Sequence, residues 1–177
     1  MARVPRAFER LVRQYERLCW HIISRMAPNP EDARDVCQEA FLRVYRFLPQ
    51  YRFESPLRSW IAQIAYSAAV RHLERKRIPL IELVDQDGSS EPLAQLSDDF
   101  DLEEASADAD LVSALRAEIA DLAPLQRTVL TLYHLEEMPI NDIARITGLG
   151  AGTIKSHLFR ARAKLRQRLE ARTRLVE

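Results

Sequence analysis

Residues 139–168 read PINDIARITGLGAGTIKSHLFRARAKLRQR, and this stretch decides the fold predicted for the C-terminal part of the chain. The pattern predicts a helix that opens at Pro139, where a missing N–H costs nothing, and ends at Gly148. The turn LGAG then leads into a second, basic helix. The apolar residues on the inner side of that helix are Ile154, Leu158 and Leu165. Two short helices joined by a Gly-containing turn are typical of a helix-turn-helix, which places its second helix in the DNA major groove. The alternative is a helical hairpin with a solvated basic face.

The neutral net charge of the 177-residue chain hides two basic blocks. Residues 1–77 hold 15 basic and 8 acidic residues, a net charge of +7. Residues 78–110 hold 11 acidic residues and no Lys or Arg, and residues 111–177 hold 11 basic and 7 acidic residues. Two basic blocks around an acidic one indicate two possible surfaces for a polyanion such as nucleic acid.

Several classes of protein are excluded by what the sequence lacks. No run of about 18 apolar residues and no signal-peptide pattern is present, so we expect a cytoplasmic protein without membrane insertion. Cys19 and Cys37 lie within helical patterns and are expected to be buried, reduced thiols, with a redox pair as the alternative. The four histidines show no metal-ligand spacing. Without a phosphate loop or a nucleophile–base pair, we expect no metal, no cofactor and no enzymatic activity.

The N-terminal block is predicted to contain three helices, over residues 5–27, 30–47 and 56–77. Asn29 is predicted to cap the second helix, with Pro30 at its first position and acidic residues in its first turn. On the side of this helix away from the apolar residues, three polar residues fall together. They are Asp35, Gln38 and Glu39.

Aromatic and arginine residues alternate around the loop before the third helix. Six of the 13 aromatic residues lie between residues 45 and 66. Rings offer stacking faces to unpaired bases and Arg contacts phosphates, so this composition suits single-stranded nucleic acid. For Phe47 and Trp60 we favour a place in the core, whereas Tyr51 and Phe53, in a Pro-bounded loop, are expected to be exposed.

The domain organisation follows from the change in character after residue 77. Residues 78–110 are acidic, punctuated by Gly, Ser and Pro, and predicted to be a flexible linker. Helical periodicity returns from about residue 108, and Pro124 opens a further helix. We therefore predict an all-α protein with two small helical domains, residues 1–77 and 111–177, joined by a flexible acidic linker.

Two stretches resemble a known family. DARDVCQEAFLRVYRFLPQYRFESPLRSWIAQIA, residues 32–65, resembles the second conserved region of bacterial RNA polymerase sigma factors. GLGAGTIKSHLFRARAKLRQRL, residues 148–169, resembles the end of their fourth region. The short length and the linker make the chain similar to the extracytoplasmic-function (ECF) class. The resemblance implies a factor that binds the β′ clamp and β flap of core RNA polymerase. It also implies that the factor directs promoter-specific initiation by contacting −35 and −10 DNA and melting the −10 region.

The resemblance also implies a role for particular positions. The Asp35, Gln38 and Glu39 cluster would dock the coiled coil of the β′ clamp. The residues that would capture a flipped −10 base are Arg52, Phe53, Glu54, Ser55 and Trp60. The residues that would lie along the phosphates are Arg71, Arg75, Lys76 and Arg77. The residues that would read the −35 element are Lys155, Ser156, Phe159 and Arg160, with Arg162 and Lys164 at the DNA backbone. The remaining cations of the reading helix are expected to be solvated.

Some features depart from the family or stay open at this point. Family members often carry Arg-Asn in place of Tyr66-Ser67, and Arg in place of His157, which lies between Lys155 and Arg160. These departures bear on which promoter sequence is read. An anti-sigma factor is implied as a partner, and the acidic linker would mimic nucleic acid inside the polymerase. The rival interpretations are an autonomous helix-turn-helix regulator, which needs a symmetric dimer, and a degenerate sigma-like adaptor.

Overall fold

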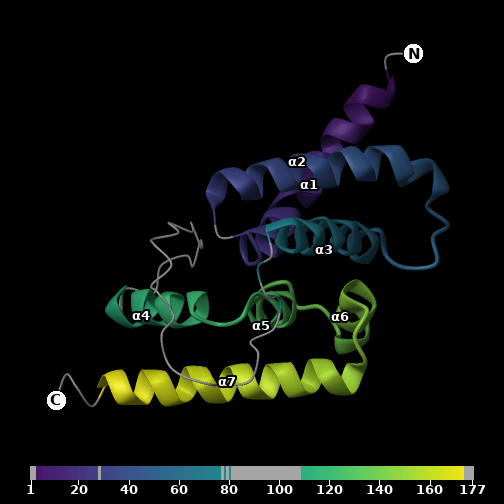
Figure 1. Ribbon diagram of the computed structural model, residues 1–177. Helices are drawn as coiled ribbons and strands as arrows, with labels where there is room; N and C mark the ends of the chain where they lie inside the picture. Colours follow the sequence, from purple (N-terminus) through teal and green to yellow (C-terminus); the bar gives the residue numbers. More distant parts are fainter. Residues whose placement is uncertain (1–2, 28, 77, 79, 81–108, 174–177) are drawn as a thin grey trace.

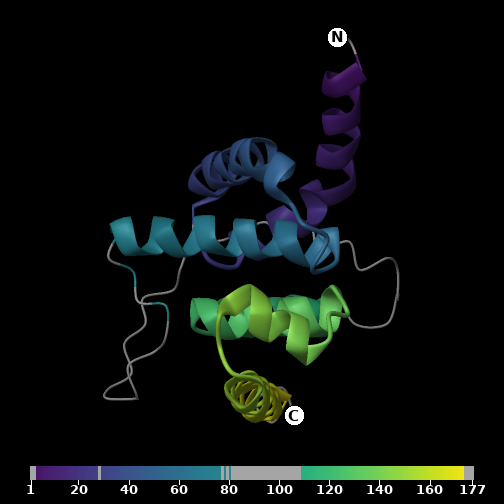
Figure 2. The same ribbon diagram turned by 90° about the vertical axis from the view of Figure 1, so that its right-hand side faces the viewer.

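The computed structural model describes residues 3–27, 29–76, 78, 80 and 109–173, and its elements are shown in Figures 1 and 2. The described residues are helical and contain no strand, which confirms the predicted all-α class. The elements of the first part are α1 (Arg3–Ser24), α2 (Pro30–Phe47), the 3-10 turn η1 (Leu48–Gln50) and α3 (Leu57–Lys76). Those of the second part are α4 (Ala109–Ala120), α5 (Pro124–Leu130), the π-type turn η2 (Thr131–Leu135), α6 (Ile140–Thr147) and α7 (Ala151–Thr173).

The first three helices form one packed unit, with α1, α2 and α3 in mutual contact. As predicted, the Asn29 side chain caps α2 by accepting a hydrogen bond from the Glu31 N–H at 2.8 Å, and Pro30 follows as the first helical residue. Bulky side chains fill the centre, among them Ile22 and Ile23 of α1 and Met26 just after it. The alanines of α3 let the helices approach closely. Those fully buried are Ala62, Ala65, Ala68 and Ala69.

In the second unit, α4, α5 and α6 each contact the long helix α7. Arg168 of α7 pairs with Glu118 at 3.2 Å and Asp121 at 2.9 Å, which ties α7 to the end of α4. The expectation that this cation is merely solvated is therefore wrong. The pairing arises because α4, far away in sequence, lies alongside the C-terminal half of α7.

The helix-turn-helix consists of α6 and α7, with two differences from the predicted boundaries. Pro139 is the residue that precedes α6 and not its first helical residue, and α7 begins at Ala151, inside the predicted turn. Gly148 ends α6 with a φ of 74°, in the left-handed region, and its N–H donates to Ala144 O at 2.9 Å. A left-handed residue at this place is the usual helix stop, so this part of the prediction is confirmed.

The two units are packed against each other, which the sequence did not predict. Helix α3 lies next to α6 (Figures 1 and 2), and α1 contacts η2. One contiguous cluster of buried apolar side chains runs from Leu18 to Leu165 and includes residues of both units. Residues 81–108, which make up most of the predicted linker, lie outside the described residues, and α4 starts at Ala109. No helix among the described residues is both long and apolar enough to cross a membrane.

Candidate polymerase-docking and DNA-binding surfaces

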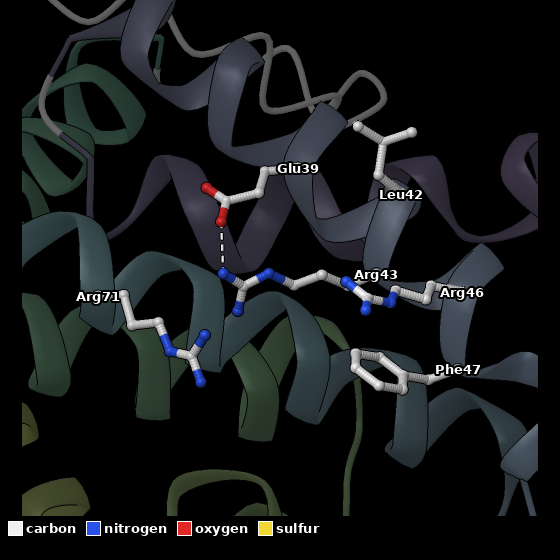
Figure 3. A pocket seen from close by; sticks show the side chains of 6 residues that line it. All are labelled: Glu39, Leu42, Arg43, Arg46, Phe47 and Arg71. Atoms are coloured by element: carbon white, nitrogen blue, oxygen red, sulfur yellow. Dashed lines mark hydrogen bonds and ion pairs between the residues drawn. The ribbon is translucent and has the colours of Figure 1, made fainter.

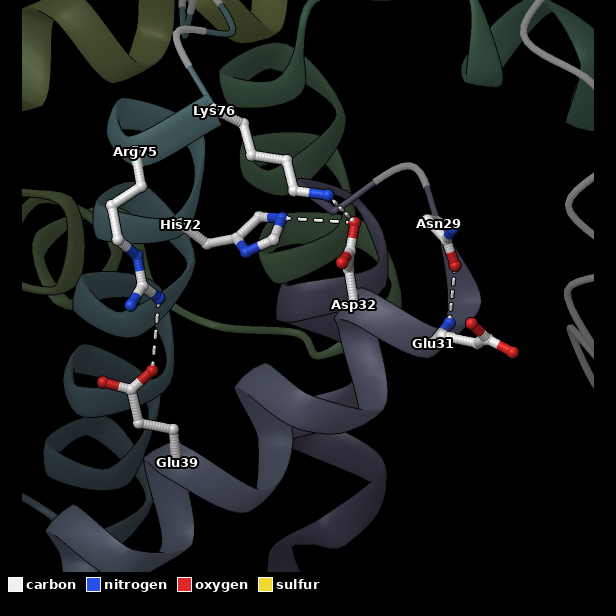
Figure 4. Close-up of polar contacts among 7 residues, drawn as sticks. All are labelled: Asn29, Glu31, Asp32, Glu39, His72, Arg75 and Lys76. Atoms are coloured by element: carbon white, nitrogen blue, oxygen red, sulfur yellow. Dashed lines mark hydrogen bonds and ion pairs between the residues drawn. The ribbon is translucent and has the colours of Figure 1, made fainter.

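Helix α2 carries the three predicted docking residues on its outer face. Asp35 and Gln38 are exposed, and Glu39 is half-buried. The Glu39 carboxylate accepts hydrogen bonds from Arg43, one turn along α2 (Figure 3), and from Arg75 of α3 at 3.4 Å (Figure 4). The structure thus leaves Asp35 and Gln38 directed to solvent, while Glu39 is held toward α3 by two arginines.

A shallow pocket of about 340 Å³ continues this face toward the end of α2 (Figure 3). Its lining residues are Glu39, Leu42, Arg43, Arg46, Phe47 and Arg71. The expected core position of Phe47 is wrong: the residue is 40% exposed, with the Arg46 guanidinium 5.8 Å from its ring centroid. Phe47 lies one turn after Arg43 on the outward stripe of α2, while Val44 takes the inward position. Leu42 was not singled out, although an apolar residue one turn after Gln38 on a polar face is a signal for a contact surface.

The loop between η1 and α3 presents one ring fully to solvent. Phe53 is 84% exposed, as expected for this loop, and has a φ of 60°, an unfavourable backbone conformation for a side chain of this size. The Tyr51 ring lies between it and α3, with centroids 4.7 Å from Phe53 and 5.1 Å from Trp60. Tyr51 also donates a hydrogen bond to Ser55 O. Tyr51 and Trp60 are both half-buried, against the expectations of an exposed Tyr51 and a core Trp60, because each ring supports the other.

The remaining predicted residues of this region lie in the same loop. Arg52 and Glu54 are exposed and Ser55 is half-buried. The three tilted rings therefore form a cluster from which Phe53 presents an exposed face with charged residues beside it, an arrangement that suits stacking of an unpaired base.

The end of α3 is basic and partly engaged with α2. Arg71 and Arg75 are exposed, whereas Lys76 donates to Asp32 at 2.6 Å, as shown in Figure 4. The hydrogen bond from Lys76 lowers the pKa of the Asp32 carboxyl. Arg77 lies outside the described residues.

Two residues of α3, Tyr66 and Ser67, differ from those that family members often carry, and one of the two lies in the core. Tyr66 is buried, and burial raises the pKa of its hydroxyl to about 12. Its neighbour Ser67 is exposed. Only Ser67 is therefore accessible to a ligand.

Helix α7 presents to solvent five of the residues that are predicted to contact −35 DNA. Lys155, Ser156, Arg160 and Arg162 are exposed, and Phe159 is 73% exposed. Ser156 Oγ donates to Gly152 O at 3.0 Å, and Arg162 Nε lies 3.2 Å from His134 Nε2. The exposed cations, hydroxyl and ring lie on the helix that a helix-turn-helix inserts into the major groove.

His157 does not lie on this surface. It is only 5% exposed, because it falls three residues after Ile154 and four before Ala161 on the inward stripe of α7. Burial, and secondarily the charge of Arg160, lowers the pKa of its imidazole. The expectation that His157 stands between the base-reading residues is wrong, and this departure from the family belongs to the packing of the domain.

Neither metal chemistry nor a disulfide is indicated in the described part of the chain. No group of three potential metal-ligating side chains gathers among the described residues. Cys19 is buried and Cys37 half-buried, and both are free thiols. Burial raises the pKa of both, that of Cys37 to about 12, which keeps them protonated and unreactive.

Comparison with known proteins agrees with both units. Residues 11–78 match the family described as Sigma-70 region 2, and residues 113–165 match Sigma-70, region 4. The RNA polymerase sigma-H factor of Pseudomonas aeruginosa is 32% identical over 168 residues, which is 93% of this chain and 87% of that protein. The ECF RNA polymerase sigma factor SigW of Bacillus subtilis is 27% identical over 92% of this chain and 89% of its own length.

Two solved structures share the fold. The sigma factor RpoE from Bartonella quintana, in complex with the anti-sigma factor NepR, superposes with a TM-score of 0.61 at 20% identity, covering 93% of this chain and 97% of that one. CnrH in complex with the cytosolic domain of CnrY gives a TM-score of 0.60 at 20% identity, covering 96% and 92%. With the two regions in this order and relatives spanning nearly the whole chain, the protein belongs to the ECF class of the sigma-70 family of RNA polymerase sigma factors. It directs promoter-specific initiation of transcription.

Proposed function

We propose that this sigma factor acts through three surfaces that lie on separate elements. The core-docking surface consists of Asp35, Gln38 and Glu39. The −10 surface consists of Arg52, Phe53, Glu54, Ser55, Trp60, Arg71 and Arg75. The −35 surface consists of Lys155, Ser156, Phe159, Arg160 and Arg162. The observation that best supports this assignment is that every one of these side chains is at least partly exposed, although each helix buries its opposite face.

The core-docking surface combines charge with a nearby apolar contact. Asp35 supplies negative charge for a basic partner helix, here the coiled coil of the β′ clamp. Such complementarity raises the association rate and the specificity more than the affinity. The exposed Leu42 next to the cluster adds apolar area, worth roughly 25 cal/mol per Å² once covered. The second domain, in turn, binds the β flap.

The −10 surface melts DNA by capturing a base and needs no ATP. Unstacking a base costs a few kcal/mol, and stacking on an aromatic side chain returns about 1–3 kcal/mol. Phe53 offers such a face and packs against Tyr51, and the ring of Tyr51 in turn packs against Trp60. Arg71 and Arg75 hold the phosphates of the open strand.

The −35 surface reads base edges in the major groove. Arg160 and Lys155 suit guanine, and Phe159 suits the methyl group of thymine. Ser156 fits either a base or a phosphate, and Arg162 contacts the DNA backbone. Because His157 is buried, Lys155, Ser156, Phe159 and Arg160 carry the reading without it.

The wider assignment follows from these surfaces. The protein contributes binding and not catalysis, and the polymerase carries out the chemistry. It works in the cytoplasm, where core polymerase and promoters are found. The domains extend over residues 1–77 and 111–177, with residues 78–110 as the linker. Since the two solved relatives of this fold are complexes with a second protein, one of them an anti-sigma factor, we extend that kind of partner to this chain.

The docking assignment is tested by replacing Asp35 and Gln38 together with Ala. We expect core polymerase binding to weaken at least about tenfold, or roughly 1.4 kcal/mol, because two exposed polar contacts are lost. The fold stays intact, since both side chains point to solvent. Binding is measured by titration of labelled core enzyme, and helicity by circular dichroism.

The matched control replaces Glu16, an exposed carboxylate on α1 and not on α2, with Ala. This variant should bind core enzyme like the unaltered protein. If the double variant also binds core enzyme with unaltered affinity, the docking surface lies elsewhere.

A further inference from the structure

Arg162, which is assigned to the DNA backbone, is held by two consecutive residues of η2. Its Nε lies 3.2 Å and its Nη2 lies 3.0 Å from Nε2 of His134. The central carbon of its guanidinium lies 5.3 Å from the centroid of the Tyr133 ring, within the range of a cation–π contact. The two rings meet edge to face, with centroids 4.9 Å apart. The three side chains therefore form one cluster at the surface of the second domain.

The imidazole of this cluster acts as a neutral acceptor. Because a guanidinium only donates hydrogen bonds, His134 Nε2 must accept both of them, and the ring proton is on Nδ1. Burial, and secondarily the charge of Arg162, lowers the pKa of His134, which favours this neutral form. The nearby carboxylate of Glu136, just after η2, is bound to His21 and Arg58 instead.

The partners of Arg162 hold it without cancelling its charge. A carboxylate partner neutralises a cation, as Glu118 and Asp121 do for Arg168 further along α7. An uncharged imidazole and an aromatic ring instead fix the guanidinium and leave its positive charge to act on a polyanion. His134 occupies the edge formed by Nε and Nη2, so Nη1 and the outer N–H of Nη2 are left for a phosphate.

Arg162 also continues the line of residues assigned to −35 DNA. It follows Phe159 by three residues and Lys155 by seven, a spacing that puts all three on one stripe of α7. Two turns, or about 10 Å at about 1.5 Å per residue, separate Arg162 from Lys155. In a helix-turn-helix, the N-terminal residues of the second helix contact base edges, so a cation two turns further on suits the phosphates beside the groove.

We propose that His134 is a positioning residue for promoter binding, which together with Tyr133 holds Arg162 ready for a phosphate of the −35 DNA and leaves its charge intact. This role rests on the proposed assignment of Arg162 to the DNA backbone. Because the free protein already fixes the arginine, less side-chain freedom is lost when the phosphate binds. A phosphate contact fixes the register of the reading helix on the duplex.

A double-mutant cycle tests whether His134 acts through Arg162. The full-length protein is reconstituted with core polymerase, and affinity is measured by fluorescence anisotropy on a promoter fragment from which this holoenzyme starts transcripts. We expect His134→Ala to weaken binding about three- to tenfold, the effect of freeing one long side chain. In an Arg162→Gln background, His134→Ala should change nothing further. An equal loss in both backgrounds would overturn the proposal.

Two other substitutions at His134 separate the holding of Arg162 from its charge. Gln keeps a neutral acceptor, so His134→Gln should restore the affinity that His134→Ala loses. Glu should bind Arg162 more strongly but neutralise it, so in His134→Glu the slope of log affinity against log salt concentration should become shallower by about 0.9, the share of one phosphate. A His134→Gln protein as weak as His134→Ala, or a His134→Glu protein with the native slope, would contradict the proposal.

Arg166, an exposed cation one turn beyond Arg162 on α7, supplies the matched control. In an Arg166→Gln background, His134→Ala should weaken binding as much as in the native protein, because the observed partner of His134 is Arg162. Circular dichroism of every variant should show native helicity.

The assignment of Arg162 itself is tested by Arg162→Gln alone, which should weaken binding and make the salt slope shallower by about 0.9. Unaltered affinity and slope would overturn both the DNA contact of Arg162 and the role of His134. A weakened Arg162→Gln protein beside an unaffected His134→Ala protein would overturn the role of His134 and leave the proposed function standing.

Discussion

His157 is a case in which the surroundings of a single residue decide its role. Its imidazole is buried, like the next residue along the chain, Leu158, whereas the preceding residue, Ser156, is exposed. Burial lowers its pKa, with a smaller contribution from Arg160. A lowered folded-state pKa means that the unfolded chain binds the proton more readily. Stability is therefore fully present above the unfolded value of about 6.5 and is lost as the pH falls through the folded value.

From this we predict that His157→Leu removes part of the acid sensitivity of the protein. The difference in the free energy of unfolding between pH 7.5 and pH 5.5 should be smaller in the variant, because position 157 then no longer carries an imidazole that binds a proton more readily in the unfolded chain than in the folded one. Urea titrations at the two pH values measure it. His134→Gln, at an exposed histidine whose pKa is also lowered by burial and by Arg162, serves as a comparison and should change the difference less. An unchanged pH dependence in His157→Leu would contradict this account.

At the scale of the elements, the turn of the helix-turn-helix depends on one backbone conformation. Gly148 has a φ of 74°, and a Cβ built there meets nothing within 4 Å. Replacement by Ala is therefore opposed by backbone strain alone and not by a clash. Gly152, in the first turn of α7, is equally open but has an ordinary helical φ.

We expect these two glycines to respond in opposite directions. Gly148→Ala should lower the free energy of unfolding by about 1–2 kcal/mol, the strain of a left-handed residue with a Cβ. Gly152→Ala should raise it by about 0.4–1 kcal/mol, because the unfolded chain becomes less flexible. Urea unfolding followed by circular dichroism measures both. Two changes of the same sign would show that something other than the backbone conformation governs the turn.

Most elements were predictable because their limits depend on local signals. The burial of some side chains was not predictable because it depends on contacts between elements. Asn29-Pro30 and Pro49 fixed the limits of α2, and Gly148 fixed the end of α6, because caps and prolines act within a few residues. Phe47, Tyr51 and His157 were misplaced because the burial of one ring depends on which neighbouring element covers it. Arg127 likewise lies buried in α5, where it donates to Ala120 O, and no periodicity reveals a buried cation.

At the scale of the whole molecule, the packing of the two domains was beyond sequence reasoning. Glu136 lies 115 residues from His21 and 78 from Arg58 along the chain. Nothing in the sequence links the three residues, because single polar contacts between distant helices leave no periodic pattern. The candidate surfaces were predictable because each lies within a few turns of one helix or loop.

Because the two domains share one buried apolar cluster, we predict that they unfold together. Both tryptophans, Trp20 and Trp60, belong to the first domain, whereas circular dichroism reports helices of both. Because that cluster joins the domains, the two signals should change together with urea in the native protein. In Glu136→Lys, a third basic side chain joins His21 and Arg58 in place of the carboxylate between them, so the signals should change at separate urea concentrations. Coincident transitions in the variant would mean that Glu136 does not couple the domains.

The separation of the inward and outward stripes of α7 also bears on how a factor of this kind diverges after gene duplication. Ile154, His157 and Leu158 are buried, whereas Lys155 and Phe159 are exposed. Substitutions at exposed positions usually change the free energy of unfolding by no more than about 0.5 kcal/mol, whereas substitutions in a core cost more. In the proposed function, promoter preference depends on the outward residues. A duplicated copy can therefore acquire a new preference while its inward residues, and hence its fold, stay as they are.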